Sequence, residues 1–353
     1  VTTPWPLYSP GALPAAGTLA LLPIRGAEAC FFLATLALMV AVAAFSLKAA
    51  NVPVAWPALI GLTSLLLLSR PGHIGLYLGQ VAAPMAWASL AAIAWGRRRP
   101  WLAAAALAAS SWKPTFGVPL AGLLWMSGAR RAAVGGAVLG TLSALVGLAP
   151  LVWRMGVASL LESASSAHAT NVGAVPLNWT RLDLASGLAR TFGHAPPGWL
   201  ILLCAGVCLA PASWTLRRLQ TVDQDASAGV NALGSRSGLI CCLATLSCVF
   251  HNTYDALLIA PGWAAVVVGP LGASLGNRWR WSLGALLTIP AVNYLSTRAF
   301  LDRFVTSEGA ATLLSVVNPA AVFLALAVAC VEAELFVRRR SSERSSTRHV
   351  LPG

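Results

Sequence analysis

Long apolar stretches broken by short arginine clusters constrain this chain more than any other feature. Two of them, residues 30–47 and 132–152, approach the about 20 apolar residues that a helix needs to cross a bilayer. Of the 353 residues, 57% are hydrophobic and only 10% are charged, whereas soluble domains carry about 25% charged residues. We therefore predict an all-α polytopic membrane protein and exclude an ordinary soluble domain.

Apolar windows between arginine clusters and Pro or Gly breaks predict about nine transmembrane helices in one membrane-embedded domain, residues 1–353. The predicted helices are residues 27–47, 54–70, 74–96, 132–154, 197–216, 237–251, 254–274, 281–297 and 311–336. Prolines interrupt two further apolar stretches, 11–24 and 101–127, which are predicted to be re-entrant or broken helices. The second is either a hairpin with Lys113 at its tip or one continuous crossing.

The basic residues indicate how the chain is oriented. Arginines occur in short clusters between the apolar stretches, and the basic tail, residues 338–353, is predicted to lie in the cytoplasm. This orientation makes residues 155–196 a long extracytoplasmic loop. In a soluble protein the net charge of +13 would suggest nucleic acid as a partner. Because the arginines here lie between apolar stretches, we predict membrane lipids as partners and no nucleic acid. The excess of arginine over lysine, with abundant Ala and Gly, suggests a bacterial inner (plasma) membrane protein.

The cysteine and histidine patterns do not indicate a metal site or a cofactor. The seven cysteines lie almost entirely inside apolar segments and form no CxxC pair, which is typical of small buried hydrophobic residues. His168 and His194 are far apart in sequence and lack the acidic neighbours of a zinc site. We predict no structural zinc, no other metal and no cofactor.

Lys113 lies between two apolar half-segments and is followed by Pro114. A lysine at membrane depth costs about 2.5–3.5 kcal/mol on insertion scales, so intramembrane lysines commonly mark functional sites. The functional interpretation is a cation that binds a lipid-linked phosphate where the proline opens the helix. The structural alternative is a lysine at a hairpin tip that extends its ammonium group to the membrane interface.

The sequence His-Asn-Thr-Tyr-Asp, residues 251–255, lies at the predicted extracytoplasmic junction of two helices. It places an imidazole, a phenol and a carboxylate within about one helical turn, and such a set can bind a phosphate or steer a sugar hydroxyl. We predict His251 and Asp255 as catalytic residues and Tyr254 as a substrate-binding residue. The structural alternative is a solvated turn with Asp255 in the first turn of the next helix.

Three further polar residues, Gln80, Asn178 and Arg181, have both a functional and a structural interpretation. The Gln80 amide, inside an apolar stretch, can bind a polar headgroup or join two helices. Asn178 and Arg181, with Asp183, can line a sugar or phosphate site or belong to a capped interfacial helix with Asp183 near its start. Short interfacial helices are predicted at residues 157–166 and 177–192.

Several segments in a common order resemble glycosyltransferase family 87. They are Tyr8-Ser9-Pro10, an apolar segment that ends in Leu21-Leu22-Pro23, Gly79-Gln80, Arg97-Arg98-Arg99-Pro100-Trp101-Leu102-Ala103, Trp112-Lys113-Pro114, Arg130-Arg131 and Tyr254-Asp255-Ala256-Leu257. The Gly-Gln and Lys-Pro pairs are the most specific of these, and the resemblance covers most of residues 8–275.

This resemblance implies a membrane enzyme of the C-type glycosyltransferase superfamily. Such an enzyme moves a sugar, here mannose, from a polyprenyl-phosphate donor to an extracytoplasmic lipid or glycan acceptor, with inversion at the anomeric carbon. We predict that Tyr8, Gln80, Lys113 and Arg181 bind the donor phosphate or its lipid, and that Asn178 and Tyr254 bind substrate.

The general base of the family is an acidic residue in the first extracytoplasmic loop, upstream of the segment that matches Tyr8. We expect this sequence to lack that N-terminal helix and loop, and Asp255 is the predicted stand-in base within the chain. Two alternatives stay open: a flippase-like lipid or solute transporter, and a scaffold whose basic tail binds anionic lipid. Counterflow of substrate without chemical conversion indicates the transporter.

Overall fold

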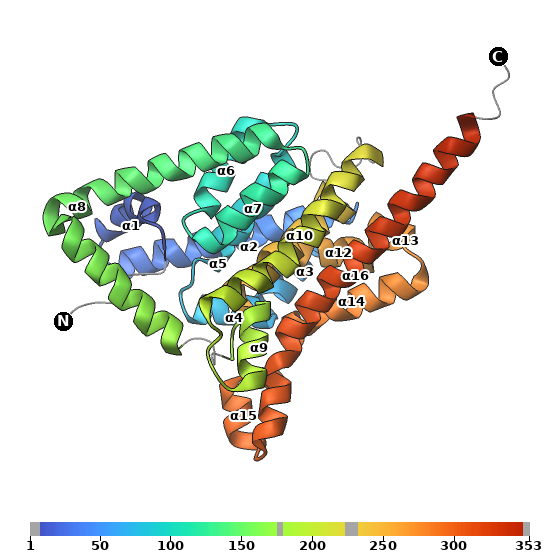
Figure 1. Cartoon of the computed structure of the whole chain (residues 1–353). Helices are drawn as coiled ribbons and strands as arrows, with labels where there is room; N and C mark the ends of the chain where they lie inside the picture. The colour runs from blue at the N-terminus through green and yellow to red at the C-terminus, as the bar shows by residue number, and fades with distance from the viewer. Residues whose placement is uncertain (1–7, 175–178, 223–231, 349–353) are drawn as a thin grey trace.

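The computed structural model describes residues 8–174, 179–222 and 232–348, and this part of the chain is helical apart from turns and one isolated β-bridge. Figure 1 shows the helices in chain order. Their bounds are η1 Pro10–Ala12, α1 Leu13–Ala20, α2 Ile24–Ala49, α3 Trp56–Leu68, α4 Arg70–Tyr77, α5 Ala82–Trp95, α6 Pro100–Ser110, α7 Pro114–Met126, α8 Arg130–Ala174, α9 Leu184–Phe192, α10 Gly198–Val222, α11 Arg236–Cys248, η3 Thr253–Ile259, α12 Ala260–Val267, α13 Pro270–Ser274, α14 Asn277–Val292, η4 Tyr294–Ser296, α15 Arg298–Phe304 and α16 Glu308–Arg348.

Four helices of the described part are long and apolar enough to cross a membrane: α2, the 130–166 part of α8, α10, and the 308–343 part of α16. The pair α3 and α4 is bent by 68° and adds a fifth span if the two together cross as one. The other apolar helices, such as α5, α6, α7 and α11, have 10–17 residues. The all-α membrane architecture is confirmed, whereas the nine predicted crossings are matched only in part.

Two of the predicted helices are wrong in their extent. The predicted helix 74–96 is interrupted, because α4 ends at Tyr77 and Gly79 adopts a left-handed conformation with φ of 59° before α5 begins. The predicted helix 254–274 consists of η3, α12 and α13, and α13 begins at Pro270, where a proline can start a helix but not continue one. A hydropathy window alone does not detect either of these helix breaks.

The stretch 101–127 forms the predicted hairpin and not one continuous crossing. Its two helices, α6 and α7, are joined by a short turn that contains Lys113, and Pro114 takes the first position of α7. The two ends of the hairpin lie together, because the guanidinium of Arg97, just before α6, donates hydrogen bonds of 2.5 and 3.2 Å to the carbonyl of Ser127, just after α7. Lys113 therefore lies at the tip of this hairpin, as predicted.

The segment predicted as a loop, residues 155–196, is largely helical. α8 continues past a sharp bend at Gly156, which has φ of 74°, so residues 157–166 are helical as predicted, and Figure 1 shows the chain folding back there. The second predicted helix begins later than residue 177, because Asp183 accepts a hydrogen bond of 3.0 Å from the Ser186 amide and caps α9. Residues 175–178 lie outside the described residues.

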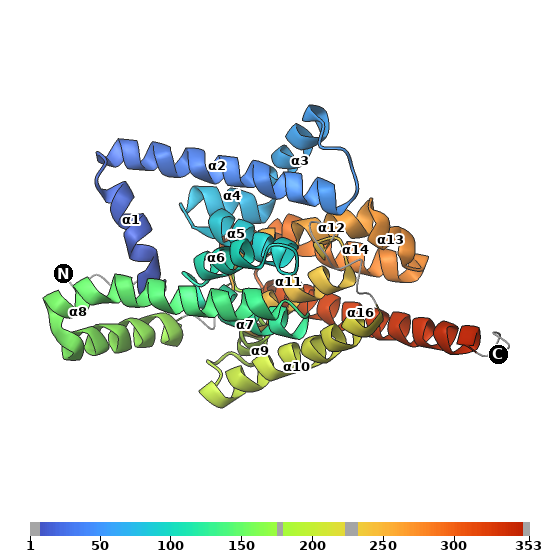
Figure 2. The same cartoon turned by 90° about the horizontal axis from the view of Figure 1, so that it is seen from above.

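The centre of the molecule is built from short helices rather than from the long ones. α5 and α11 are buried along almost their whole length, and Figure 2 shows α5, α6 and α11 between α2 on one side and α8, α10 and α16 on the other. Most of the buried positions of α5 are alanine, and such small side chains let helix backbones approach closely. This packing holds the tip of the α6–α7 hairpin against η3.

Candidate active site

The ammonium group of Lys113 is buried and paired with the carboxylate of Asp255. The Lys113 Nζ and Asp255 Oδ2 atoms are 2.5 Å apart, and the two side chains are 5% and 0% exposed. The ammonium also lies 5.2 Å from the ring centroids of both Phe116 and Tyr254, a cation–π distance. The alternative in which Lys113 extends to the membrane interface is therefore wrong.

Asp255 lies in the first turn of η3, and its two carboxylate oxygens have different surroundings. Oδ2 accepts a hydrogen bond of 2.9 Å from the Asn252 amide in addition to the contact with Lys113. Oδ1 is buried and has no hydrogen-bond partner among the residues that the structure describes. The position in the first turn agrees with the structural alternative, but full burial excludes a solvated turn. One oxygen thus stays available to accept a proton or a hydrogen bond.

His251 bridges the hairpin tip and Asp255. Its Nδ1 atom is 3.1 Å from Asp255 Oδ2, and its Nε2 atom is 3.1 Å from the carbonyl oxygen of Thr115. Phe116 packs edge-on against the imidazole, with ring centroids 4.5 Å apart. The imidazole thus contacts the carboxylate on one side and the backbone of the hairpin tip on the other. Lys113, His251 and Asp255 are here called the triad.

The N-terminal segment brings Tyr8 to the same region. The Ser9 amide donates a hydrogen bond of 2.7 Å to the Trp112 carbonyl at the hairpin tip, and the Tyr8 hydroxyl donates one of 3.2 Å to Gln80 Oε1. Burial, with the Asp255 charge as a second cause, raises the pKa of Tyr8 to about 12, so the phenol keeps its proton. Gln80 lies in the break between α4 and α5, and it contacts Tyr8 there rather than making the contact between helices of its structural alternative.

The segment after Asn178 pairs with the triad segment through its backbone. The Leu182 amide donates to the His251 carbonyl at 2.7 Å, and the Thr253 amide donates to the Thr180 carbonyl at 2.6 Å. These hydrogen bonds form the isolated antiparallel bridge between Arg181 and Asn252. The segment therefore fixes the backbone from which His251 projects.

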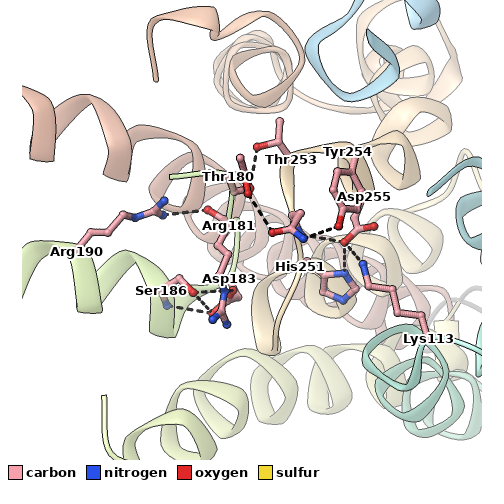
Figure 3. A network of polar contacts seen from close by, with 11 residues as sticks. Lys113, Thr180, Arg181, Asp183, Ser186, Arg190, His251, Thr253, Tyr254 and Asp255 are labelled. Atoms are coloured by element: carbon pink, nitrogen blue, oxygen red, sulfur yellow. Dashed lines mark hydrogen bonds and ion pairs between the residues drawn. The ribbon is translucent and has the colours of Figure 1, made fainter. Parts of the chain in front are cut away.

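The Arg181 side chain does not join the triad. Its Nε atom is 2.9 Å from Asp183 Oδ2, and its guanidinium lies 4.3 Å from the ring centroid of Phe250. Figure 3 shows Arg181 and Asp183 together, apart from Lys113. Asn178, the other residue predicted in this segment, lies outside the described residues. Of the eight predicted site residues, Tyr8, Gln80, Lys113, His251, Tyr254 and Asp255 share the region around the hairpin tip.

Two features of the structure, one in the site and one outside it, were not predicted from the sequence. Phe116 supplies the ring that packs against both Lys113 and His251, and its position three residues after Lys113 in a helical segment is the signal that was available. Arg70 is only 1% exposed, and its guanidinium donates to the Asn293 carbonyl at 2.5 Å and contacts the Ser296 hydroxyl. In the sequence, Arg70 is the last residue of the predicted transmembrane helix 54–70, a position at which arginine is common.

The described residues contain no group of three or more His, Cys, Asp or Glu side chains that could hold a metal ion. The seven cysteines are free thiols, and six of them are buried, in agreement with their prediction as small buried hydrophobic residues. Cys30 is exposed on α2. The polar chemistry of the described part is therefore that of charged and hydrogen-bonding side chains around Lys113 and Asp255.

Comparison with protein families places the sequence in a known family. The model of glycosyltransferase family 87 matches residues 6–250, a region that contains Tyr8, Gln80 and Lys113 and ends directly before His251. Comparison with curated proteins and with solved structures gives no match. The matched region covers more than half of the chain, and the chain belongs to glycosyltransferase family 87.

Proposed function

We propose that this chain transfers a sugar, with mannose as the expected one, from a polyprenyl-phosphate donor to an extracytoplasmic lipid or glycan acceptor. The observation that carries the proposal is the buried triad of Lys113, His251 and Asp255 at the tip of the α6–α7 hairpin. The proposed setting is a bacterial inner membrane, with the hairpin tip at the extracytoplasmic side.

The triad suits a reaction in which a phosphate departs. In the proposed step the acceptor oxygen forms a bond to the anomeric carbon, and the bond between that carbon and the phosphate oxygen breaks. The polyprenyl phosphate leaves with the bonding electrons, and cations placed where this charge develops lower the barrier. Lys113 Nζ supplies such a cation, and the His251 imidazole lies beside it, because both side chains contact Asp255 Oδ2 within one buried cluster.

Inversion requires one base and no covalent intermediate on the protein. The acceptor hydroxyl loses its proton as its oxygen attacks from the face opposite the phosphate. We assign this proton to Asp255, whose Oδ1 atom is buried and has no hydrogen-bond partner in the described part of the chain. Lys113 and the Asn252 amide hold the other oxygen, Oδ2, and thereby fix the direction in which Oδ1 points.

The neighbouring residues complete the proposed site. Tyr8, whose phenol is held by its hydrogen bond to Gln80, lines the donor side of the site, and Tyr254 lines the site beside Lys113. Asn178 keeps its predicted role in substrate binding. Arg181 is assigned a positioning role, because its guanidinium pairs with Asp183 while its backbone pairs with the triad segment.

The experiment is transfer of radiolabelled mannose from polyprenyl-phosphate-mannose by membranes that contain this chain. We expect a labelled product together with release of polyprenyl phosphate, and His251→Gln should lower the rate by about 10²-fold because a charge-stabilising donor is lost. The matched control is His194→Gln, at an exposed histidine whose Nδ1 atom lies 3.4 Å from the neighbouring Ala195 carbonyl oxygen, and it should keep the wild-type rate.

Three results contradict the proposal. Labelling from a nucleotide-activated mannose but not from the polyprenyl donor contradicts the donor assignment. Movement of the intact donor across proteoliposomes without conversion favours the transporter. Equal rates for His251→Gln and wild type remove the triad from the mechanism.

A further inference from the structure

The carboxamide of Asn252 connects two parts of the site through its side chain. Its Nδ2 atom donates a hydrogen bond of 2.6 Å to the phenol oxygen of Tyr254, and its Oδ1 atom accepts one of 3.2 Å from the Thr180 hydroxyl. Dashed lines in Figure 3 run from Thr180 through this carboxamide to Tyr254. Asn252 and Tyr254 are both buried, so water does not compete for the bond between them.

The Tyr254 hydroxyl uses its oxygen as an acceptor in this arrangement. A phenol has one hydrogen to donate, and it keeps this hydrogen at neutral pH because phenols lose it only near pH 10. The hydrogen has no acceptor among the residues that the structure describes. The contact with Asn252 therefore leaves the phenol as a donor with nothing of the described protein to donate to.

Tyr254 lies beside the cation of the triad. The Lys113 ammonium is 5.2 Å from the centroid of the Tyr254 ring and 2.5 Å from the carboxylate of the next residue, Asp255. A phosphate bound at this ammonium brings anionic oxygens, which are strong hydrogen-bond acceptors. A second donor beside the ammonium would stabilise the charge that develops as the phosphate leaves.

The side chain and the backbone of Asn252 make separate contacts. The backbone amide donates to Asp255 Oδ2 at 2.9 Å, and any residue other than proline at this position keeps that contact. In the same way, the Thr180 carbonyl accepts from the amide and the hydroxyl of Thr253, at 2.6 and 2.8 Å, whatever side chain position 180 carries. Side-chain substitutions at positions 180 and 252 therefore address the phenol and leave the backbone contacts in place.

We propose that Asn252 is a positioning residue whose carboxamide, held by the Thr180 hydroxyl, directs the hydrogen of the Tyr254 phenol to a phosphate oxygen of the bound donor. This inference rests on the proposed transfer at the triad and adds a neutral hydrogen-bond donor to its cation. Neither Asn252 nor Thr180 touches the substrate, and no bond forms or breaks between the three side chains. The segment after residue 178 then acts on the chemistry through Tyr254.

The test measures transfer of radiolabelled mannose from polyprenyl-phosphate-mannose over a range of donor concentrations. Membranes contain equal amounts of the full chain as wild type, Tyr254→Phe, Asn252→Ala, or the double variant with both changes. The matched control is Tyr77→Phe, at a tyrosine of α4 that is 82% exposed, and it should keep the wild-type rate. Elution as a single species in detergent shows that each protein is folded.

Tyr254→Phe should lower kcat by about 10²-fold and change the KM for the donor by less than about twofold, because the hydrogen bond strengthens only as the phosphate gains charge. Asn252→Ala should lower kcat by about tenfold, because the phenol hydrogen is then free to turn away. The double variant should be no slower than Tyr254→Phe, since Asn252 acts through the phenol alone.

A second pair of variants tests the outer residue of the connection. Thr180→Val should lower kcat by about threefold, the effect expected for one neutral hydrogen bond, whereas Thr180→Ser keeps the hydroxyl and should restore the wild-type rate. The matched control is Thr191→Val, at an exposed threonine whose hydroxyl donates to the Gly187 carbonyl of its own helix at 3.0 Å. Equal rates for Thr180→Val and wild type overturn the role of Thr180.

The direction of the hydrogen bond has its own variant. The carboxylate of Asn252→Asp has no hydrogen to donate, so it should draw the phenol hydrogen to itself and lower kcat about as much as Tyr254→Phe does. Transfer at the wild-type rate by Asn252→Asp means that the phenol donates to residue 252, which overturns the proposal.

Other outcomes overturn the inference in distinguishable ways. Asn252→Ala that slows the Tyr254→Phe protein by the same factor as the wild type has only a structural role. A rise in the KM for the donor at unchanged kcat contradicts a role of the phenol in the departure of the phosphate. Full activity of Tyr254→Phe overturns the inference and leaves the proposed function intact, whereas a wild type that forms no labelled product overturns both.

Discussion

Replacement of Asp255 by asparagine is expected to lower sugar transfer by about 10³-fold, because general-base catalysis contributes about 10²–10⁴-fold to such reactions. The amide keeps the size of the side chain and can still accept a hydrogen bond from the Asn252 amide, but it cannot take up a proton from the acceptor. The measurement is the initial rate with saturating polyprenyl-phosphate-mannose, together with the elution profile of the purified variant in detergent.

The control for this variant is Glu308→Gln, at an exposed carboxylate in the first turn of α16, and it should keep the wild-type rate. A folded Asp255→Asn protein that retains more than about a tenth of the wild-type rate contradicts the assignment of the base, since loss of a general base costs more than this. The base is then another carboxylate, and Asp255 acts only by fixing Lys113.

The second large effect concerns the pairing of Lys113 with Asp255. Lys113→Met leaves a buried carboxylate without its ammonium partner, and removal of one member of a buried ion pair typically costs about 3–5 kcal/mol. The double variant Lys113→Met with Asp255→Leu removes both charges, so we expect it to regain most of the free energy of unfolding. Neither protein should transfer sugar, because the cation at the departing phosphate is missing in both.

The measurement is a double-mutant cycle in detergent, from the free energies of unfolding of the wild type, both single variants and the double variant. Recovery of stability without recovery of activity separates the role of the pair in folding from its role in chemistry. Additive losses of stability contradict a buried ion pair between these residues. Transfer at the wild-type rate by a folded double variant contradicts the proposed mechanism.

Much of the fold class was predictable, because apolar composition and short arginine clusters constrain a membrane protein strongly. The α6–α7 hairpin was one of two alternatives, and the contact of Arg97 with Ser127 decided between them. Helix boundaries were harder to predict. A hydropathy window averages over the left-handed conformation at Gly79 and over the bend at Gly156, and therefore merges or shortens helices there.

The individual residues of the candidate site could be predicted from the sequence, but their contacts with one another could not. A lysine at membrane depth and the His-Asn-Thr-Tyr-Asp sequence each indicated function on their own. Their direct contact joins Lys113 to a residue 142 positions later, and a single sequence carries no signal for such a pairing. For Arg181 the partner was visible in the sequence, because Asp183 lies only two residues away, but the sequence did not show that this pairing keeps the guanidinium out of the triad.

The position of the donor phosphate is the most direct test of the proposed mechanism. The measurement is a structure of the full chain in lipid with a non-hydrolysable phosphonate analogue of polyprenyl-phosphate-mannose. We expect a phosphonate oxygen at about 3 Å from Lys113 Nζ or a nitrogen of His251, the distance of a charge-assisted hydrogen bond, with the anomeric carbon facing Asp255. A phosphonate bound away from the hairpin tip, with Lys113 and Asp255 still paired and untouched, would contradict it.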